Sequence, residues 1–288
     1  MSSTALEVAP VRLAGGRWSD DWRTVRVVWK RELIRFRRNH VRIVTSLAQP
    51  ILFLFVLGTG LSSFVGSSRT SGIDYRTFVF PGVLTMTVLF TATFSAISIV
   101  WDREFGFLRE MLVAPARRGA IIVGKAVGGA TVATMQGCIM LALAGLVHIP
   151  YSIPLFAVLI LEMALAAFML TAFGLMLASG IQQVESFQVV VQFFVMPMFF
   201  LAGALFPLSG LPTWLSILTR IDPLAYAVDP MRRAVFLAVG VPATAMHLLV
   251  PGISWFGWRV PTVLEVLIVA VLGVVLTVVA AFRFGKTE

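Results

Sequence analysis

The sequence is poor in the residues that build chemical sites. Its 288 residues include one cysteine, three histidines and 14 acidic side chains, and charged residues make up only 13% of the chain. The single cysteine, Cys138, excludes a disulfide framework and a cysteine metal cluster. The histidines, His40, His148 and His247, lie far apart in the sequence. No metal site is therefore expected, because a metal site needs convergent ligands.

A nucleotide-binding loop is also missing. Gly119 to Ala126, GAIIVGKA, comes close to the phosphate-binding pattern G-x-x-x-x-G-K-[ST]. However, Ala126 has no hydroxyl group for magnesium, and no buried strand precedes the glycine. Lys125 is instead expected to extend to the membrane interface. We therefore expect the chain to bind no nucleotide or other cofactor.

Apolar residues dominate the composition. They make up 58% of the chain, the mean hydropathy is +0.92, and there are 23 phenylalanines. These values lie far outside the range of soluble domains. Because roughly 20 apolar residues are needed to cross the bilayer, the sequence predicts an all-α integral membrane protein. Its domain over 41–284 is expected to have six transmembrane helices, at 43–62, 78–101, 121–147, 154–179, 188–206 and 261–282.

The positive charges predict how these helices are oriented. Of the 23 Lys and Arg residues, 17 fall in segments on the side of the amino terminus and six on the other side. The positive-inside rule then places both termini in the cytoplasm. The same rule accounts for the net charge of +9, so nucleic-acid binding is not expected. The first long apolar run begins near Ile43, so no cleavable signal peptide is expected either.

Residues 21–40 have the pattern of a surface helix. They follow a segment over 1–20 that is expected to be a flexible tail, and they repeat apolar side chains at helical spacing with basic residues around the other face. This pattern predicts an amphipathic helix that lies in the interface against membrane lipid. An ordinary basic segment beside the membrane is the alternative. The residues expected to define the helix are Trp22, Trp29, Arg31 and Phe36.

A second surface segment separates the second and third spans. Eight charged residues lie within 101–125, and several apolar side chains between them share one helical face. A short helix ended by Pro115 is expected here, at the membrane boundary, as a docking element for another protein. The candidate contact residues are Phe105, Leu108 and Leu112 on the apolar face and Arg103, Glu104, Arg109 and Glu110 among the charged residues.

The connection over 207–260 alternates short apolar pieces with Pro, Gly and Asp. Pieces over 216–218 and 226–239 are expected to be helical, with Asp229 as the N-cap and Pro230 as the first helical residue of the second piece. Apolar pieces of this length predict short re-entrant or interfacial helices that cap the bundle on its outer side.

Polar side chains within the predicted spans need partners, because a charge is costly in lipid. Glu162 lies deep enough to face the bundle interior, and Gln136 and Gln192 are candidate partners by type and depth. Glu265 lies nearer the end of its span, where it either has a partner or is protonated or extends toward the outer interface. No second acid or base accompanies these glutamates, so no catalytic pair is predicted.

Prolines and glycines predict irregular helix geometry and close packing. Pro50, Pro81 and Pro197 lie within or near the ends of spans, where they are expected to kink or end a helix. Gly124 and its neighbours Gly128 and Gly129 allow another backbone to approach closely.

Two stretches resemble a known family. The run REFGFLREMLVAPARRGAIIVGK is similar to the loop between spans two and three of permease subunits of ABC-2 type ATP-binding-cassette exporters, of the daunorubicin-resistance, nodulation-factor and polysaccharide-export kind. FPLSGLPTWL and IDPLAYAVDPMRRA are similar to their outer loop before the last span. The resemblance covers residues 23–284. It implies a six-span half-transporter in the bacterial cytoplasmic membrane that pairs with an identical or related permease.

The resemblance also implies a function. Two ATPase subunits, which bind ATP and magnesium, would drive outward transport of an amphipathic drug, lipid or lipid-linked glycan. The segment 104–112 would be the coupling helix, and the helix over 22–36 would also lie against the ATPase. A polytopic membrane enzyme acting on lipid-linked substrates is the alternative, but it needs a cluster of reactive side chains at one membrane depth. An ion channel would need rings of charge or a filter of carbonyl groups, which the sequence does not indicate.

Overall fold

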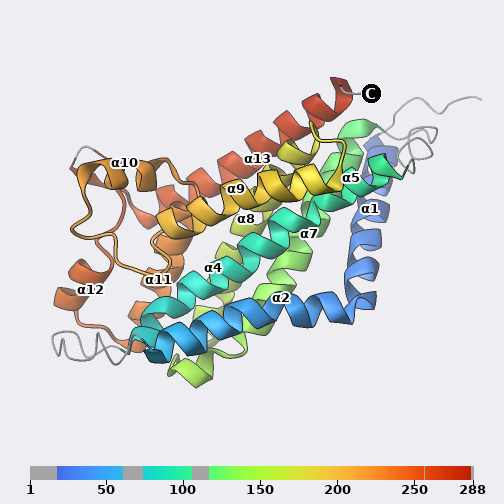
Figure 1. Ribbon diagram of the computed structural model, residues 1–288. Helices are drawn as coiled ribbons and strands as arrows, with labels where there is room; N and C mark the ends of the chain where they lie inside the picture. The colour runs from blue at the N-terminus through green and yellow to red at the C-terminus, as the bar shows by residue number, and fades with distance from the viewer. Residues whose placement is uncertain (1–17, 61–73, 106–116, 256, 287–288) are drawn as a thin grey trace, which may run out of the picture.

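The computed structural model describes residues 18–60, 74–105, 117–255 and 257–286, and these are mostly helical. Long helices run alongside one another between two ends of a bundle (Figure 1). One end, here called the α1 end, carries α1, Trp18–Arg38, which lies across it. The opposite end, the α11 end, carries three short helices, which are α10, Thr213–Ile221, α11, Ala225–Val239, and α12, Ala243–Leu249.

Five helical segments of the described residues are long and apolar enough to cross a membrane. Each overlaps a span predicted from the sequence. The segments are His40–Gly60, Tyr75–Glu104, Ile153–Ala178, Val184–Leu201 and Thr262–Gly285. The first segment contains α2, His40–Leu52, and the π-helical turn η1, Phe53–Leu57. The second contains α4, Tyr75–Ser95, and α5, Ile97–Glu104. The other three are formed by α8, Ile153–Ala178, α9, Val184–Leu201, and α13, Thr262–Lys286.

The range of the predicted third span is occupied by α7, Arg118–Leu141, and the 3-10 turn η2, Ala144–Val147. α7 packs against α1, α4, α8 and α13. It is less apolar than the five segments above because it contains Lys125 and Gln136. The GAIIVGKA stretch lies within its first turns, so the backbone there is a helix and not a phosphate-binding loop.

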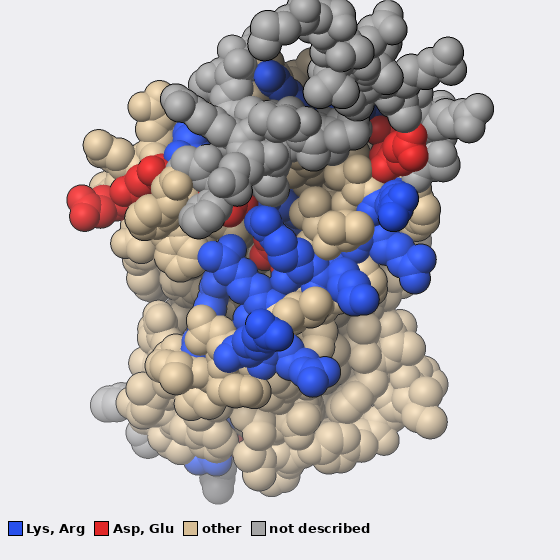
Figure 2. All heavy atoms as spheres, turned by 90° about the vertical axis from the view of Figure 1, so that its right-hand side faces the viewer, with Lys and Arg blue, Asp and Glu red and all other residues tan. Residues whose placement is uncertain are grey.

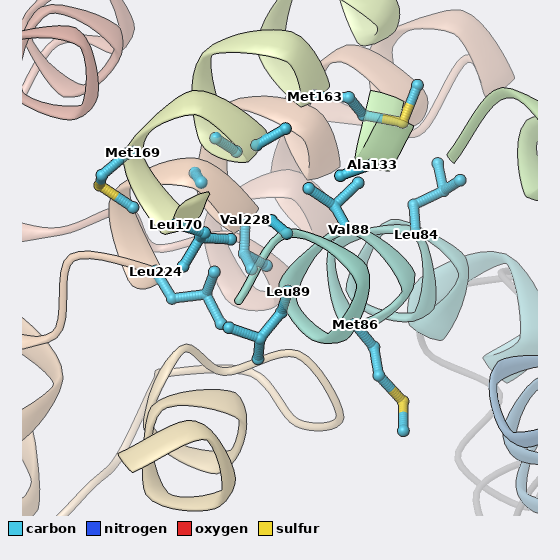
Figure 3. Close-up of a cluster of buried hydrophobic side chains, with 14 of the residues drawn as sticks. Leu84, Met86, Val88, Leu89, Ala133, Met163, Met169, Leu170, Leu224 and Val228 are labelled. Atoms are coloured by element: carbon cyan, nitrogen blue, oxygen red, sulfur yellow. The ribbon is translucent and has the colours of Figure 1, made fainter. Parts of the chain in front are cut away.

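α4 and α5 form the central helix of the bundle. In Tyr75–Glu104, 83% of the most apolar stretch is buried, whereas only 17% is buried in the segment that contains α2. Figure 3 shows the core where α4, α7, α8 and α11 meet. Because lipid tails are as apolar as these side chains, close van der Waals packing is what favours this arrangement. The core residues in that view include Leu84, Val88, Leu89, Ala133, Met163, Leu170 and Val228.

Glycines bring α1 against α7. A Cβ atom added to Gly124 would lie 2.8 Å from the Val28 Cβ, and one added to Gly128 would lie 3.0 Å from Glu32. The predicted close approach of a backbone at these glycines is confirmed, and the neighbour is α1. The Trp29 indole N–H also donates a hydrogen bond to Thr131 Oγ1 at 3.1 Å. The aromatic face of α1 is therefore divided, because Trp29 packs on α7 while Trp22 is 71% exposed.

The three prolines lie inside helices and end none of them. Pro50 is in α2, Pro81 in α4 and Pro197 in α9. The helix that contains Pro50 widens into the π-helical turn η1 directly afterwards. A proline has no backbone N–H and cannot complete the regular bonding pattern, which favours such a local adjustment.

The start of α11 differs from the prediction. Asp229 and Pro230 do not begin this helix but lie within it. The preceding Asp-Pro pair marks the true start, because Asp222 Oδ1 accepts a hydrogen bond from the Leu224 N–H at 3.0 Å and α11 begins at Ala225. A two-stranded hairpin of β1, Ser254–Trp255, and β2, Trp258–Arg259, then leads toward α13. The helix predicted over 216–218 is also longer and forms α10.

Candidate functional site at the end of α5

Asp102, near the end of α5, connects three helices. Its Oδ2 atom lies 2.8 Å from Lys125 Nζ of α7 and 2.9 Å from Arg31 Nη2 of α1. Lys125 also donates a hydrogen bond to Ser98 Oγ at 2.8 Å, and its ammonium group lies 3.8 Å from Glu32 of α1. We call these five residues the α5 charge cluster. It joins α1, α5 and α7.

Lys125 is the buried centre of this cluster. Its side chain is 2% exposed, and that of Asp102 is 11% exposed. Removing an ammonium group from water costs several kcal/mol, which the close carboxylate and hydroxyl groups offset. The prediction that Lys125 extends to the interface is therefore wrong. The physical reason is the close approach of α1 at Gly124 and Gly128, which brings Glu32 to 3.8 Å from the lysine ammonium group.

The next two residues of α5 bond to the facing ends of α8 and α9. Arg103 Nη1 donates a hydrogen bond to Ile181 O at 2.8 Å, and Arg103 also donates to carbonyl groups at the end of α8. Glu104 Oε2 accepts a hydrogen bond at 2.9 Å from the N–H of Val184, the first residue of α9. A helix has partial negative charge at its C-terminus and partial positive charge at its N-terminus. Each side chain thus has the sign that its helix end favours.

Residues 102–104 therefore connect the end of α5 to α1, α7, α8 and α9. The chain continues from α5 directly into residues 106–116. This segment, with the predicted contact residues Leu108, Arg109, Glu110 and Leu112, lies outside the described residues. Phe105 precedes it and is 68% exposed. The bonds of residues 102–104 thus join the helix that precedes this segment to four other helices.

A second buried cluster lies at the α11 end. Arg233 forms an ion pair with Asp229 of its own helix, and its Nη2 lies 3.4 Å from Glu265 Oε1 of α13. Arg233 also donates a hydrogen bond to Thr262 Oγ1 at 2.8 Å. Glu265 is fully buried. Of the two alternatives for Glu265, the structure therefore has the partner, and the side chain does not extend to the interface.

Arg232 completes the α11 cluster, which we define as Asp229, Arg232, Arg233 and Glu265. Its guanidinium group donates to the backbone carbonyl of Gly203, just after α9, and lies 4.5 Å from the ring centroid of Phe78 in α4. This buried arginine therefore holds α11 against α4 and the chain that follows α9.

Glu162 does not contact its predicted partners. Gln136 Nε2 donates to Ile43 O at 3.0 Å and to Ser46 Oγ at 2.7 Å, both in α2. Gln192 is exposed on α9. Glu162 is half-buried beside α11 and α13, and its Oε2 atom has no hydrogen-bond partner within the described part of the chain.

The model of the family described as ABC-2 type transporter matches residues 23–236. The chain belongs to this family. The resemblance predicted from the sequence is confirmed, and the ABC-2 permease is a multi-pass membrane protein. The matched range includes every residue of the α5 charge cluster, from Arg31 to Lys125.

Of three relatives of this ABC-2 permease, two are named as transport permeases. Nodulation protein J of Rhizobium leguminosarum bv. viciae is 30% identical over 233 residues, which cover 78% of this chain and 84% of the relative. The inner membrane transport permease YadH of Escherichia coli strain K12 is 26% identical over 213 residues, covering 73% and 82%. The probable multidrug ABC transporter permease YbhR of the same strain is 33% identical over 159 residues, covering 54% and 43%.

The structure of the permease reveals roles that sequence reasoning missed. The contact of Arg103 and Glu104 with a partner protein stays a prediction, and in the described residues the two side chains also bond to α8 and α9 of the same chain. Only Phe105, among the described contact residues, is mainly exposed and apolar. A signal for the α5 charge cluster did exist, because Lys125 is a charge within an apolar run and such a charge needs a partner.

Proposed function

We propose that this permease is the six-span membrane subunit of an ABC exporter, driven by a separate ATPase subunit that binds ATP and magnesium. In this proposal α7 is the third span, both termini lie in the cytoplasm, and the α1 end faces the ATPase. Two permease copies, identical or related, pair with two ATPase subunits in the bacterial cytoplasmic membrane. The short helices α10, α11 and α12 then cap the outer side.

The charge of the α1 end supports this orientation. Figure 2 shows Lys and Arg side chains gathered on that face. The positive-inside rule expects such a surface on the cytoplasmic side, where it also meets anionic lipid. The exposed basic residues of α1 are Arg23, Arg26, Lys30, Arg31, Arg35, Arg37 and Arg38.

The observation that carries the proposal is the set of bonds at the end of α5. A soluble motor can move a membrane bundle only through a rigid connection at its boundary. Phe105 and the segment 106–116 would supply the contact with the ATPase, including Leu108, Arg109, Glu110 and Leu112. Asp102, Arg103 and Glu104 would then transmit the movement to the bundle. Arg103 and Glu104 thus act as internal anchors of the coupling segment.

One name among the relatives, probable multidrug ABC transporter permease, supports an amphipathic drug as cargo. We propose that the cargo is an amphipathic drug, lipid or lipid-linked glycan, moved outward by alternating access between two permease copies. Apolar and small residues of α2, α4 and α9 would line the route.

Purification of the tagged permease in mild detergent tests the proposal. We expect an ATPase subunit to co-purify and to hydrolyse ATP in the presence of magnesium. Phe105→Glu places a charge on the proposed contact and should reduce the recovered ATPase by about tenfold, which corresponds to ~1.4 kcal/mol of binding free energy. Trp214→Glu is the matched control, because Trp214 is 64% exposed on α10 at the opposite end. Purification of the unmodified permease without any ATPase would contradict the proposal.

A further inference from the structure

Two adjoining cavities lie beside the elbow where α1 turns into α2. The first, of about 290 Å³, is lined by α1, α2, α4, α5 and α7. The second, of about 230 Å³, lies between α2 and α4. Both are lined by Phe36, Arg42 and Phe94. We call them together the elbow cavity.

The elbow cavity carries positive charge that the described chain does not neutralise. Arg35 and Arg42 line it, and neither forms an ion pair with a carboxylate among the described residues. The Arg35 guanidinium lies 5.0 Å from the ring centroid of Trp101, which positions it by a cation–π contact. Glu32 also lines the cavity, where its carboxylate lies 3.8 Å from the buried Lys125 ammonium group and also acts electrostatically on Arg42. Two arginines against one glutamate leave the described lining with a net positive charge for a ligand.

The deeper part of the cavity combines aromatic rings with an unpaired hydroxyl group. Phe90 and Phe94 stack with their ring centroids 6.3 Å apart, and both line the second cavity. Thr91 lies between them in the sequence and is 7% exposed, yet its Oγ1 atom has no hydrogen-bond partner in the described chain. A buried polar atom of this kind favours a ligand that brings a partner for it.

We propose that the elbow cavity binds the phosphate group of an anionic lipid from the cytoplasmic leaflet. Arginine guanidinium groups form charge-assisted, often bidentate hydrogen bonds with phosphate oxygens. The aromatic wall of Phe36, Phe90 and Phe94 accommodates the apolar chain. A soluble phosphate would gain nothing from that wall, and a cationic amphiphile would be repelled by the arginines. The inference rests on the proposed function only in placing the elbow at the cytoplasmic leaflet.

Lipid binding to the purified full-length permease, measured by native mass spectrometry without ATPase or nucleotide, tests this site. Phosphatidylglycerol should bind the unmodified chain. Arg35→Gln combined with Arg42→Gln should weaken that binding by about tenfold or more, as expected for lost charge-assisted contacts. The control, Arg37→Gln with Arg38→Gln, removes the same charge from exposed positions outside the cavity. It should change the affinity by less than about threefold.

A second lipid and a competition measurement identify the ligand. Phosphatidylcholine with the same chains should bind about tenfold more weakly, and millimolar glycerol phosphate should not compete with phosphatidylglycerol. Equal binding of the two lipids, competition by glycerol phosphate, or equal losses in the two double variants would each overturn the assignment. If the cavity variant does not fold, each arginine is replaced singly, and Thr91→Val should weaken binding without changing charge. If the lipid-binding test fails, the ATPase subunit should still co-purify with the permease, so this failure is distinguishable from failure of the proposed function.

Discussion

The two ends of the bundle each hold a buried charge cluster, but the two clusters connect different sets of helices. The α5 charge cluster joins three helices, and the two residues that follow Asp102 add α8 and α9. It also leads directly into residues 106–116. The α11 cluster joins α11 to α13, to α4 and to the chain after α9. In the proposed function only the α5 end, which precedes the proposed contact segment, would transmit movement. The connections that the charges make distinguish the two ends.

Loss of Asp102 should have the largest effect. Asp102→Asn leaves the buried Lys125 ammonium group without its closest carboxylate, which should lower the free energy of unfolding by about 3 to 5 kcal/mol. A double variant with Lys125→Met removes both charges and should recover part of this loss. The change in tryptophan fluorescence on heating measures the unfolding. Equal stability of Asp102→Asn and the unmodified permease would contradict a structural role for the pair.

Arg233→Met is the equivalent change at the α11 end. It leaves Asp229 and Glu265 buried without their shared cation, so a destabilisation of similar size, about 3 to 5 kcal/mol, is expected. The two variants should differ in how strongly the permease changes the activity of the ATPase subunit. Folded Arg233→Met permease should still change the rate of ATP hydrolysis, whereas folded Asp102→Asn permease should lose most of this effect. Equal loss in both would remove the distinction between the two ends.

Gly124→Ala tests whether the α5 charge cluster needs α1 in close contact. The added Cβ would lie 2.8 Å from the Val28 Cβ, and overpacking of this kind costs about 1 to 3 kcal/mol. Gly119→Ala in the same helix is the control, because nothing lies within 4 Å of its added Cβ. It should be neutral or slightly stabilising, since alanine favours helix. Tryptophan fluorescence on heating compares the two variants, and identical melting would argue against tight α1–α7 packing.

The smallest effect concerns pH at the α11 end. Burial raises the pKa of Asp222 from 3.8 to about 7, although a hydrogen bond from the Leu224 N–H opposes the shift. Between these values the folded protein keeps a proton that the unfolded chain has lost. Stability should therefore fall as the pH rises from about 4 to 7 and stay lower above that. Asp222→Asn should melt with less dependence on pH, measured by tryptophan fluorescence. An unchanged pH dependence would show that other groups cause it.

Local patterns in the sequence predicted the helices well. Hydropathy and helical spacing are properties of neighbouring residues, so the apolar segments and the amphipathic α1 were visible before folding. The Asp-Pro pairs were ambiguous because two of them occur seven residues apart. Only the structure shows that Asp222, and not Asp229, precedes α11.

The candidate site was harder to predict because its bonds cross between distant segments. The bonds of Arg103 and Glu104 could not be predicted, since nothing local reveals that the ends of α8 and α9 meet there. The burial of Lys125 likewise depends on α1 covering α7, which the glycines permit but do not specify. Sequence alone indicates that a charge needs a partner, and tertiary packing selects which partner it has.

The most direct test follows ATP-driven movement in the complete transporter. Nitroxide labels at positions 38 and 182, exposed near α1 and α9, are placed in a Cys138→Ser background in complex with the co-purified ATPase. Adding ATP should shift the distance between them in the otherwise unmodified permease and in Glu185→Ala, whose carboxylate is exposed beside Val184. Glu104→Ala should keep the ATPase bound but abolish most of the shift. A full shift in Glu104→Ala would contradict the claim that the end of α5 transmits the movement.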